Sequence, residues 1–580
     1  MGTRRRLSRR RRRVRISNVF RFIIVLLVIG GLIATAVFLL FPGGKTGGDQ
    51  PRTQGPEATP TATPGLPESL RPRADESAKP SNFGFNTDVM VDGSVVSRYE
   101  RTEKISFPGA DAYTALEGVA TFRGNNYRTT SSYGTADVSE GKLTKVWEKT
   151  NASLKGDAGV WTGVGWTGQP LIIRWPDQTR SIMNLYPDKK KKTGLVEVIY
   201  PTLDGHIYFF DLEDGSKTRE AINLGVPFKG TASVDPRGYP LLYVGQGDTV
   251  RGGAMKYRII SLIDQTVLFE MNGKDPFSYR RWTAFDSSAL VDAASDTLVE
   301  PGENGVLYTI KLNTSFDPEA GTISVDPDEP VKYRYKADGL ADNSGSRWWG
   351  TENSMAGWRN YGFFTDNGGY MQCVDLNTME PVWVQDVIDD SDSTIALEES
   401  LSDQTVYLYT ATQVDKQPNA QTDGHAYIRK VDGMTGRIVW EKKYPCTYNS
   451  HVAGGVLSSP VLGREGSDIE GVVIYNIAKE KGGGSLLVAL DKQTGEEKWT
   501  LRIRNYCWPS PLAVYDEQGK SYIAQCDSRG RMLLIAGATG EVLDTISIQD
   551  ETTIEASPAA FGDMIVIGTR GQRIVGVRIG

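Results

Sequence analysis

The stretch that decides the fold reads ALDKQTGEEKW and runs from Ala489 to Trp499. An apolar run leads into it, and the polar turn residues Asp491, Thr494 and Gly495 follow. In such a turn the Asp side chain accepts hydrogen bonds from its own loop, and Gly supplies a residue with positive φ. The pattern therefore predicts a β-hairpin whose second strand carries Trp499.

Related turns recur along the chain, which indicates a repeat architecture. They lie at 211–215, 375–378, 432–436, 491–495 and 537–540, with a degenerate copy at 262–265. In three of them a Trp follows the turn Asp by eight residues, namely Asp375 with Trp383, Asp432 with Trp440, and Asp491 with Trp499. Small residues and a Pro open an apolar strand before the later hairpins, so each unit contains three strands, a turn and a fourth strand.

Units of about 40–60 residues with four antiparallel strands are typical of a β-propeller. The units lie at about 153–220, 229–272, 282–336, 347–388, 393–445, 451–504, 506–548 and 553–580. The last unit has only three strands, and Leu143–Glu148, with Trp147, has the character of the missing fourth. We therefore predict an all-β fold: an eight-bladed propeller over 143–580, closed by an N-terminal strand that completes the C-terminal blade.

The N-terminal segment predicts a membrane anchor. Residues 1–21 form a basic tail with ten Arg, and residues 22–41 run for 20 residues without a charge. At 1.5 Å per residue such a helix spans a bilayer core of roughly 30 Å. The Arg cluster is expected to stay in the cytoplasm, which places the rest of the chain outside, at the plasma membrane. A cleaved signal peptide, with an apolar region of about 7–15 residues, is the alternative.

Two further segments lie before the propeller. Residues 42–80 are rich in Pro, Gly and Thr and read as an extended linker. Residues 81–142 regain aromatic and aliphatic residues and are expected to form a lead-in segment that packs on the propeller.

Charge and cysteine content exclude several classes of function. The net charge of the 580 residues is −6, and the 539 residues after the basic tail and apolar segment carry −16, so a nucleic-acid partner is not expected. The four Cys are too few for a disulfide framework, and none are spaced as CxxC. A disulfide between Cys446 and Cys507 remains open, because the outside of a cell permits it.

The motif Ala-x-Asp-x-x-Thr-Gly-x-x-x-Trp resembles the tryptophan-docking repeat of the pyrroloquinoline-quinone (PQQ) propellers. Ala489 to Trp499 matches it fully, and the turns that begin at Asp432 and Asp375 match in part. The stretch Phe122-Arg123-Gly124-Asn125 is similar to a lead-in seen before these propellers. The resemblance implies that the Trp packs against the neighbouring blade while Asp, Thr and Gly fix the turn.

The resemblance does not choose a function, since the same propeller serves quinoprotein dehydrogenases and non-catalytic envelope scaffolds. The dehydrogenases carry adjacent cysteines beside the cofactor, and this chain has no such pair. We therefore expect no cofactor; PQQ with Ca²⁺ is the alternative, and whether a metal binds stays open.

Candidate ligand-binding residues at the channel mouth come from the first strand of each blade, which lines the central channel, at a position shortly before its Pro or the equivalent residue. Aligned over the eight units, this position reads Thr167, Ser233, Asp286, Glu352, Glu398, Leu457, Trp508 and Glu555. The carboxylates predict an acidic arc suited to a hard cation or a cationic ligand. A solvated channel mouth without a ligand is the other interpretation.

Aromatic clusters at 281–282, 347–349 with Trp358, and 506–509 either form a rim that recognises peptide, glycan or protein, or pack between blades. The sequence thus favours a membrane-anchored, extracytoplasmic scaffold that binds an envelope protein or polymer. The alternative is an enzyme, either a PQQ-dependent oxidoreductase or a hydrolase of envelope polymer.

Overall fold

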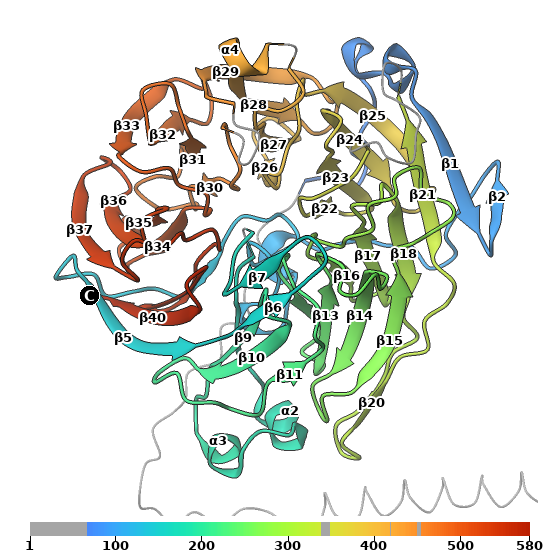
Figure 1. Cartoon of the computed structure of the whole chain (residues 1–580). Coiled ribbons are helices and arrows are strands. Elements are labelled where there is room, and N and C mark those ends of the chain that lie inside the picture. Colours follow the sequence, from blue (N-terminus) through green and yellow to red (C-terminus); the bar gives the residue numbers. More distant parts are fainter. Residues whose placement is uncertain (1–65, 167, 338–348, 418, 449–453) are drawn as a thin grey trace, which may run out of the picture. The chain divides into compact units, whose positions relative to one another are not determined.

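The computed structural model describes residues 66–166, 168–337, 349–417, 419–448 and 454–580, all within one compact unit. Among these residues, eight antiparallel sheets stand around a common centre, each with its first strand innermost (Figure 1). The predicted eight-bladed β-propeller is confirmed.

Four blades come first along the chain. Blade 1 contains β8 (Leu171–Arg174), β9 (Glu197–Pro201), β10 (His206–Asp211) and β11 (Ile222–Asn223). Blade 2 contains β12 (Ser233–Val234), β13 (Leu241–Gly245), β14 (Lys256–Ser261) and β15 (Val267–Asn272). Blade 3 contains β16 (Leu290–Asp292), β17 (Thr297–Pro301), β18 (Leu307–Lys311) and β21 (Val331–Lys336). Blade 4 contains β22 (Ala356–Trp358), β23 (Tyr361–Thr365), β24 (Tyr370–Asp375) and β25 (Glu380–Asp386).

The other four blades complete the ring. Blade 5 contains β26 (Ala396–Ser400), β27 (Thr405–Ala411), β28 (His425–Asp432) and β29 (Ile438–Pro445). Blade 6 contains β30 (Val461–Leu462), β31 (Val472–Ala478), β32 (Ser485–Asp491) and β33 (Glu497–Ile503). Blade 7 contains β34 (Leu512–Tyr515), β35 (Ser521–Cys526), β36 (Arg531–Ala536) and β37 (Val542–Ser547). Blade 8 contains β38 (Ala559–Phe561), β39 (Met564–Thr569), β40 (Arg573–Ile579) and β5 (Leu143–Thr150).

The ring closes through β5. This N-terminal strand pairs antiparallel with β40, with Leu143 opposite Ile579 and Trp147 opposite Gly576. The predicted closure is therefore confirmed, and it ties the two ends of the propeller together without leaving a sheet edge between the first and last blades.

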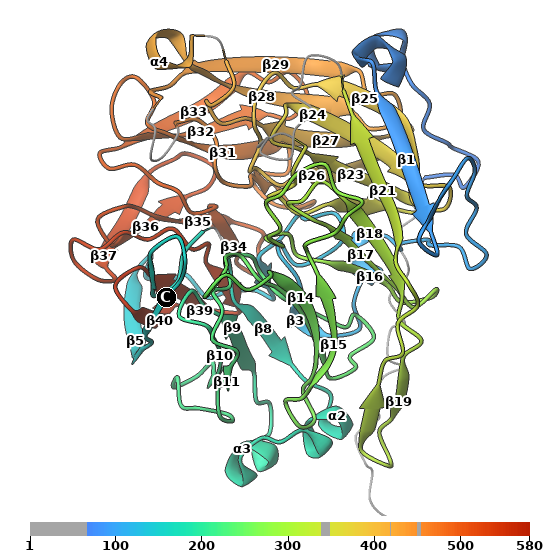
Figure 2. The ribbon, with the colours of Figure 1, turned by 45° about the vertical axis from the view of Figure 1, so that its right-hand side comes forward.

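Insertions extend several blades. Blade 1 carries α2 (Asp177–Ile182) and α3 (Pro187–Lys191), blade 3 carries the hairpin β19–β20 (Ser315–Asp317, Thr322–Ser324), and blade 5 carries α4 (Ala420–Asp423). The hairpin β6–β7 (Ser153–Lys155, Val160–Thr162) lies toward the centre of the ring (Figure 1). Figure 2 shows β19 projecting beside α2, where the Gln178 amide donates to Glu319 at 2.7 Å.

Position within a blade decides the residue pattern of each strand. The second strands β31, β35 and β39 are buried at every residue, because neighbouring blades cover both of their faces. They accordingly read as continuous apolar runs such as MIVIGT. The outer strand β37 alternates between exposed and half-buried residues, since only one of its faces packs.

Four tryptophans join consecutive blades. The indole N–H of each donates to a backbone carbonyl in the next blade's hairpin turn, at 2.8–3.0 Å: Trp147 to Leu212, Trp383 to Gly433, Trp440 to Lys492, and Trp499 to Gly537. A positive-φ glycine lies under each ring, namely Gly215, Gly436, Gly495 and Gly540. We call this arrangement the tryptophan clamp.

The stretch from Asp491 to Trp499 contributes a β-bulge and a turn to these clamps. At Trp499 the register shifts, so that Ala489 pairs with Trp499 but Leu490 pairs with Glu497. The extra residue of a bulge bends and twists its strand, which re-aims the side chain beside it. In the turn itself, Asp491 accepts from the backbone N–H groups of residues 493 and 494, both at 2.9 Å.

Gly495→Ala should open one clamp. A Cβ at Gly495 would lie 2.8 Å from Trp440 Cδ2, and φ is +72°. Gly466→Ala is the matched control, because its φ is +73° but a Cβ there meets nothing within 4 Å. We expect Gly466→Ala to lower the free energy of unfolding by about 1 kcal/mol, from backbone strain alone. Gly495→Ala should lower it by roughly 1–3 kcal/mol more, because the new Cβ meets the indole. Urea unfolding measures both values. Equal losses in both variants would contradict the clamp.

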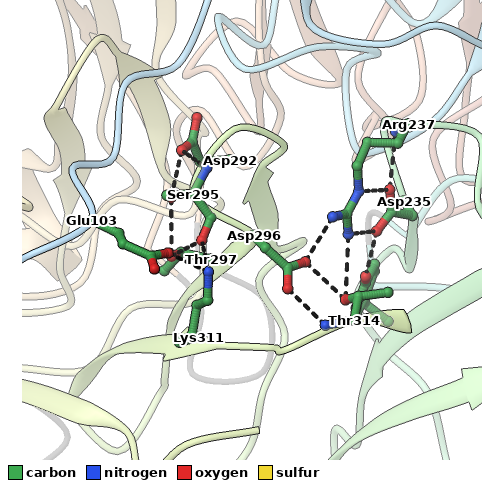
Figure 3. Close-up of polar contacts among 10 residues, drawn as sticks. Glu103, Asp235, Arg237, Asp292, Ser295, Asp296, Thr297, Lys311 and Thr314 are labelled. Atoms are coloured by element: carbon green, nitrogen blue, oxygen red, sulfur yellow. Dashed lines mark hydrogen bonds and ion pairs between the residues drawn. The ribbon is translucent and has the colours of Figure 1, made fainter. Parts of the chain in front are cut away.

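The segment before the propeller adds strands to three blades. β1 (Asn86–Val91) pairs with β21 and with β2 (Ser94–Val96), β3 (Glu117–Val119) pairs with β8, and β4 (Ser132–Tyr133) pairs with β38. Figure 3 shows the contact of this segment with blade 3, beside the ion pairs that join blades 2 and 3. Glu103 pairs with Lys311, while Arg237 joins Asp235 at 2.6 Å to Asp296 at 2.7 Å.

The predicted membrane span over 22–41 lies outside the described residues, as do the basic tail and most of the linker. In the part of the chain that the structure describes, every helix is too short or too polar to cross a bilayer.

Candidate functional site

A ring of hydroxyl groups sets the register of the inner strands. Backbone N–H groups at the start of these strands donate to a Ser or Thr hydroxyl of the next blade, at 2.8–3.1 Å. The pairs are Gln169 to Thr231, Ser288 to Ser354, Ser354 to Thr394, Thr394 to Ser459, Ser459 to Ser510, and Ser510 to Ser557. We call these residues the hydroxyl ring, and they show which positions of different blades are equivalent.

The residues two positions before the hydroxyl ring form one rim of the channel, which we call the mouth. They are Lys229, Asp286, Glu352, Asp392, Leu457, Trp508 and Glu555. The structure thus brings Asp286, Glu352, Trp508 and Glu555 to equivalent positions. Thr167, which would fill the series in blade 1, lies outside the described residues.

The predicted place of Glu398 at the mouth is wrong. Glu398 follows Thr394 of the hydroxyl ring by four residues, and Asp392 holds the mouth position in blade 5. Glu398 instead binds Lys492 at 2.6 Å and lines a cavity of about 370 Å³ on the opposite side of the ring. Blade 2 shows the same error, since Lys229 and not Ser233 lies at the mouth.

The lead-in segment closes the other end of the channel. Residues 120–131, which we call the plug, form hydrogen bonds to inner strands or their entrances in all eight blades. The partners, from blade 1 to blade 8, are Gln169, Val234, Ser288, Gly357, Leu397, Pro460, Pro511 and Ala560. Gly357 follows the ring residue Ser354 by three positions, whereas Glu352 precedes it by two, so plug and mouth lie at opposite ends of the strands.

Two buried arginines hold the plug in place. Arg123 donates to the carbonyls of Pro460 and Pro511, and Arg128 donates to those of Ser288 and Met355. Burial lowers the pKa of both guanidinium groups to about 10. The stretch around Arg123 that the sequence singled out therefore fills the end of the ring opposite the mouth.

Five carboxyl groups gather on one side of the mouth. Asp286, Glu352 and Asp392 come from the mouth position of blades 3, 4 and 5, and Glu303 and Asp390 lie beside them. Asn367 Nδ2 bridges Glu352 Oε1 and Asp390 Oδ1, at 3.1 Å each. We call these five residues the acidic arc.

Two cations oppose the acidic arc. The Arg280 guanidinium bonds Glu303 at 3.1 Å and the Asn367 side chain at 2.6 Å. Lys229 Nζ lies 3.8 Å from the Asp286 carboxylate. Its ammonium is also 4.3–5.4 Å from the ring centres of three indoles, those of Trp161, Trp166 and Trp282.

Burial controls the protonation of the arc. It raises the pKa of Asp286 to about 7, where Lys229 opposes the shift and the charge of Glu352 adds to it. Burial and the neighbouring Glu352 likewise hold the pKa values of Glu303, Asp390 and Asp392 well above the usual range. Some of these carboxyl groups are therefore protonated at neutral pH, which limits the repulsion within the arc.

Aromatic side chains occupy the other side of the mouth. The Trp508 ring lies 5.5 Å from that of Trp166, which lies 5.7 Å from that of Trp161, with Tyr506 packed alongside. By contrast, Trp349 and Trp358 are buried in the core and serve packing, while residues 347 and 348 lie outside the described residues. The mouth therefore combines an acidic half with an aromatic half.

Sequence reasoning missed Lys229, Glu303, Asp390 and the indoles of Trp161 and Trp166. The acidic run from Asp389 to Asp392 directly before a Ser-Thr pair was a usable signal. Glu303 could not be found in this way, because it follows a second strand and reaches the mouth only through folding.

The residues at the mouth do not fit an anionic quinone cofactor. PQQ carries carboxylates of its own, and the acidic arc would repel them, while Lys229 and Arg280 already have carboxylate partners. Over the described ranges, no group of three or more His, Cys, Asp or Glu side chains has the geometry of a metal site. All four cysteines are buried and unpaired, so the Cys446–Cys507 disulfide is absent.

The raised pKa of Asp286 gives a test of the arc. Between about pH 4 and pH 7 the folded protein holds a proton at Asp286 that the unfolded chain has released. Stability should therefore fall as pH rises through this window. We expect Asp286→Asn to raise the melting temperature at pH 8, by an amount equivalent to roughly 1–3 kcal/mol, and to change it little at pH 4.

Glu517→Gln, which removes an exposed carboxylate in blade 7, is the control and should show no such pH dependence. A pH profile of Asp286→Asn that runs parallel to that of the wild type would contradict the assignment.

Comparisons with known proteins give structural neighbours only. No protein-family profile and no curated protein sequence matches the chain. BamB from Moraxella catarrhalis is 14% identical at a TM-score of 0.42, covering 66% of this chain and 93% of its own. A quinohemoprotein alcohol dehydrogenase from Pseudomonas putida is 12% identical at a TM-score of 0.47, and the match covers 80% of each chain. Another from Comamonas testosteroni is 12% identical at a TM-score of 0.41, and the match covers 80% of this chain and 81% of its own. Quinohemoprotein dehydrogenases are thus among the neighbours of this chain, at values that carry no function over to it.

Proposed function

We propose that this chain is a membrane-anchored binding propeller of the cell envelope, which holds a ligand or a partner protein at the channel mouth and performs no chemistry of its own. The basic tail, the apolar segment and the linker suit a propeller tethered outside the plasma membrane. The partner is an envelope protein or polymer within reach of that tether.

The division of the ring into a plugged end and a polar end is the observation that carries this proposal. The plug occupies one end through contacts with every blade, which leaves the charged and aromatic groups of the mouth at the other end. Recognition sites commonly combine aromatic anchors with a few charged groups in this way. The turns of the tryptophan clamps, by comparison, pack against the indoles of the neighbouring blades.

The side chains at the mouth favour binding over catalysis. Burial raises the pKa of Cys507, next to Trp508, so this thiol is a poor nucleophile. The two described histidines begin β10 and β28 in blades 1 and 5, and His206 already contacts Asp204. Neither forms the nucleophile–base pair that covalent catalysis requires.

A hydrolase of envelope polymer is the second candidate, because the acidic arc holds carboxyl groups that stay protonated beside aromatic rings. General-acid catalysis of glycoside cleavage uses such a group together with a second carboxylate. We expect no increase in reducing ends when the protein is incubated with solubilised envelope glycan. Cleavage that Glu303→Gln abolishes would replace the binding proposal with this one.

Crosslinking tests the location of the site. A photoreactive amino acid in place of exposed Arg281, beside the mouth residue Trp282, should form partner adducts in native membranes. The same substitution at exposed Glu465, which lines the cavity on the plug side, serves as the control and should form few. Adducts from position 465 alone, or from neither position, would contradict a binding site at the mouth.

Cofactor binding provides an independent test. The full-length protein in detergent is mixed with PQQ and millimolar Ca²⁺ and then passed over a gel-filtration column. We expect no quinone absorbance in the protein fraction and no Ca²⁺-dependent change of melting temperature in the wild type or in Glu352→Gln. Bound quinone would favour the dehydrogenase alternative, and a calcium shift lost in Glu352→Gln would identify a metal site.

A further inference from the structure

Several carboxylate oxygens at the mouth accept no hydrogen bond from the described residues. Asp286 is 7% exposed, yet neither of its carboxylate oxygens accepts a hydrogen bond. Oδ1 of Asp392 is likewise buried without a hydrogen-bond partner. Buried carboxylates without donors are costly, since they lose water and gain little in return. The charge of Glu352 acts on both residues, so the three carboxyl groups are neighbours on the acidic side of the mouth.

Lys229 shows what kind of group this side of the mouth accepts. Its ammonium is 6% exposed and is held by cation–π contacts with three indoles and by the charge of Asp286 at 3.8 Å, with no hydrogen bond among the described residues. Burial lowers the pKa of Lys229, but Asp286, Glu303 and Glu352 outweigh burial and leave the pKa raised. An aromatic cage with carboxylates at its edge is a general way to hold a cation.

Among the described residues, the charges at the mouth do not balance. The five carboxyl groups of the acidic arc oppose Lys229 and Arg280 there, and the elevated pKa values mean that protons make up part of the difference. A cation entering from outside would displace these protons and supply the missing donors. A cation with an apolar neighbour would also gain contact with Trp508 and Tyr506 on the other side.

We propose that the ligand of the mouth is a basic polypeptide segment, which inserts a Lys or Arg side chain against Asp286, Glu352 and Asp392 and rests an adjacent apolar residue on Trp508. This proposal rests on the proposed function and names its ligand. Lys229 is the internal competitor of the inserted side chain, because both cations draw on the same carboxylates.

Peptide binding to the full-length protein in neutral detergent tests this proposal. The probe is a fluorescent, end-blocked nonapeptide of lysine, leucine and serine, and its matched versions carry glutamine or glutamate in place of lysine. Fluorescence anisotropy should show binding of the lysine peptide only, weakening as salt increases. The affinity should rise from pH 5 to pH 8, because Asp286, whose pKa burial raises to about 7, loses its proton over this range.

Variants of the mouth make the test specific. Asp286→Asn and Glu352→Gln should each weaken binding of the lysine peptide about tenfold, and Trp508→Ala at least fivefold. Lys229→Met should strengthen binding about fivefold, since it removes the competitor. Glu465→Gln, on the plug side of the ring, is the matched charge control and should change the affinity less than twofold.

The sign of the Lys229→Met effect separates the possible ligands. Loss of binding in Lys229→Met, or preference for the glutamate peptide, would overturn the proposal in favour of an anionic ligand held by Lys229. Equal binding of all three peptides would also overturn it. If position 281 crosslinks in membranes while the lysine peptide fails to bind, the proposed function stands and this inference alone fails; if position 281 gives no adducts, both fail.

Discussion

The contact between an indole and a glycine joins neighbouring blades of the ring. Each tryptophan clamp combines a hydrogen bond to a backbone carbonyl, a large buried ring and a glycine whose missing side chain makes room for that ring. Two neighbouring sheets can approach this closely only where the turn between their outer strands has no Cβ. The clamp thereby fixes the angle between blades at four junctions, those of blades 8 and 1, 4 and 5, 5 and 6, and 6 and 7.

The centre of the ring is held by polar contacts instead of apolar packing. Hydroxyl groups link the inner strands on one side, and the plug, with Arg123 and Arg128 donating to backbone carbonyls, fills the other. Inner strands lie too far apart to pair with one another, so their ends need partners from side chains. Because a single segment provides these partners for all eight blades, the lead-in is an integral part of the propeller fold.

The carboxyl groups of the mouth are only partly satisfied by the described residues. Asn367 and Arg280 connect the carboxyl groups of blades 3, 4 and 5, but Asp286 and Asp392 have buried oxygens that accept no hydrogen bond there. Such a cluster lowers stability unless protons or a ligand neutralise it. Its position opposite aromatic rings suits a binding site built on a rigid scaffold.

The sequence by itself determined the blade count, the closing strand and the role of the turns. The Asp491–Trp499 stretch is local, and its copies keep their spacing, so a repeat could be read without any long-range contact. The sequence also pointed to Trp508 and Glu555, because small residues and a Pro mark the strand entrances in blades 7 and 8, and to Asp286 and Glu352 by alignment with them. Without a Pro the alignment is less certain, and Glu398 was placed six residues from the true position at Asp392.

Only the tertiary structure decided which residues meet at the mouth. Side chains of a strand alternate with a period of two, so a slip of four or six residues leaves the same face toward the channel and cannot be detected from the pattern. The hydroxyl ring removes this ambiguity, because its hydrogen bonds join residues of different blades. Lys229, Glu303 and the plug depend on contacts between distant parts of the chain, and their positions follow from closure of the ring rather than from any local signal.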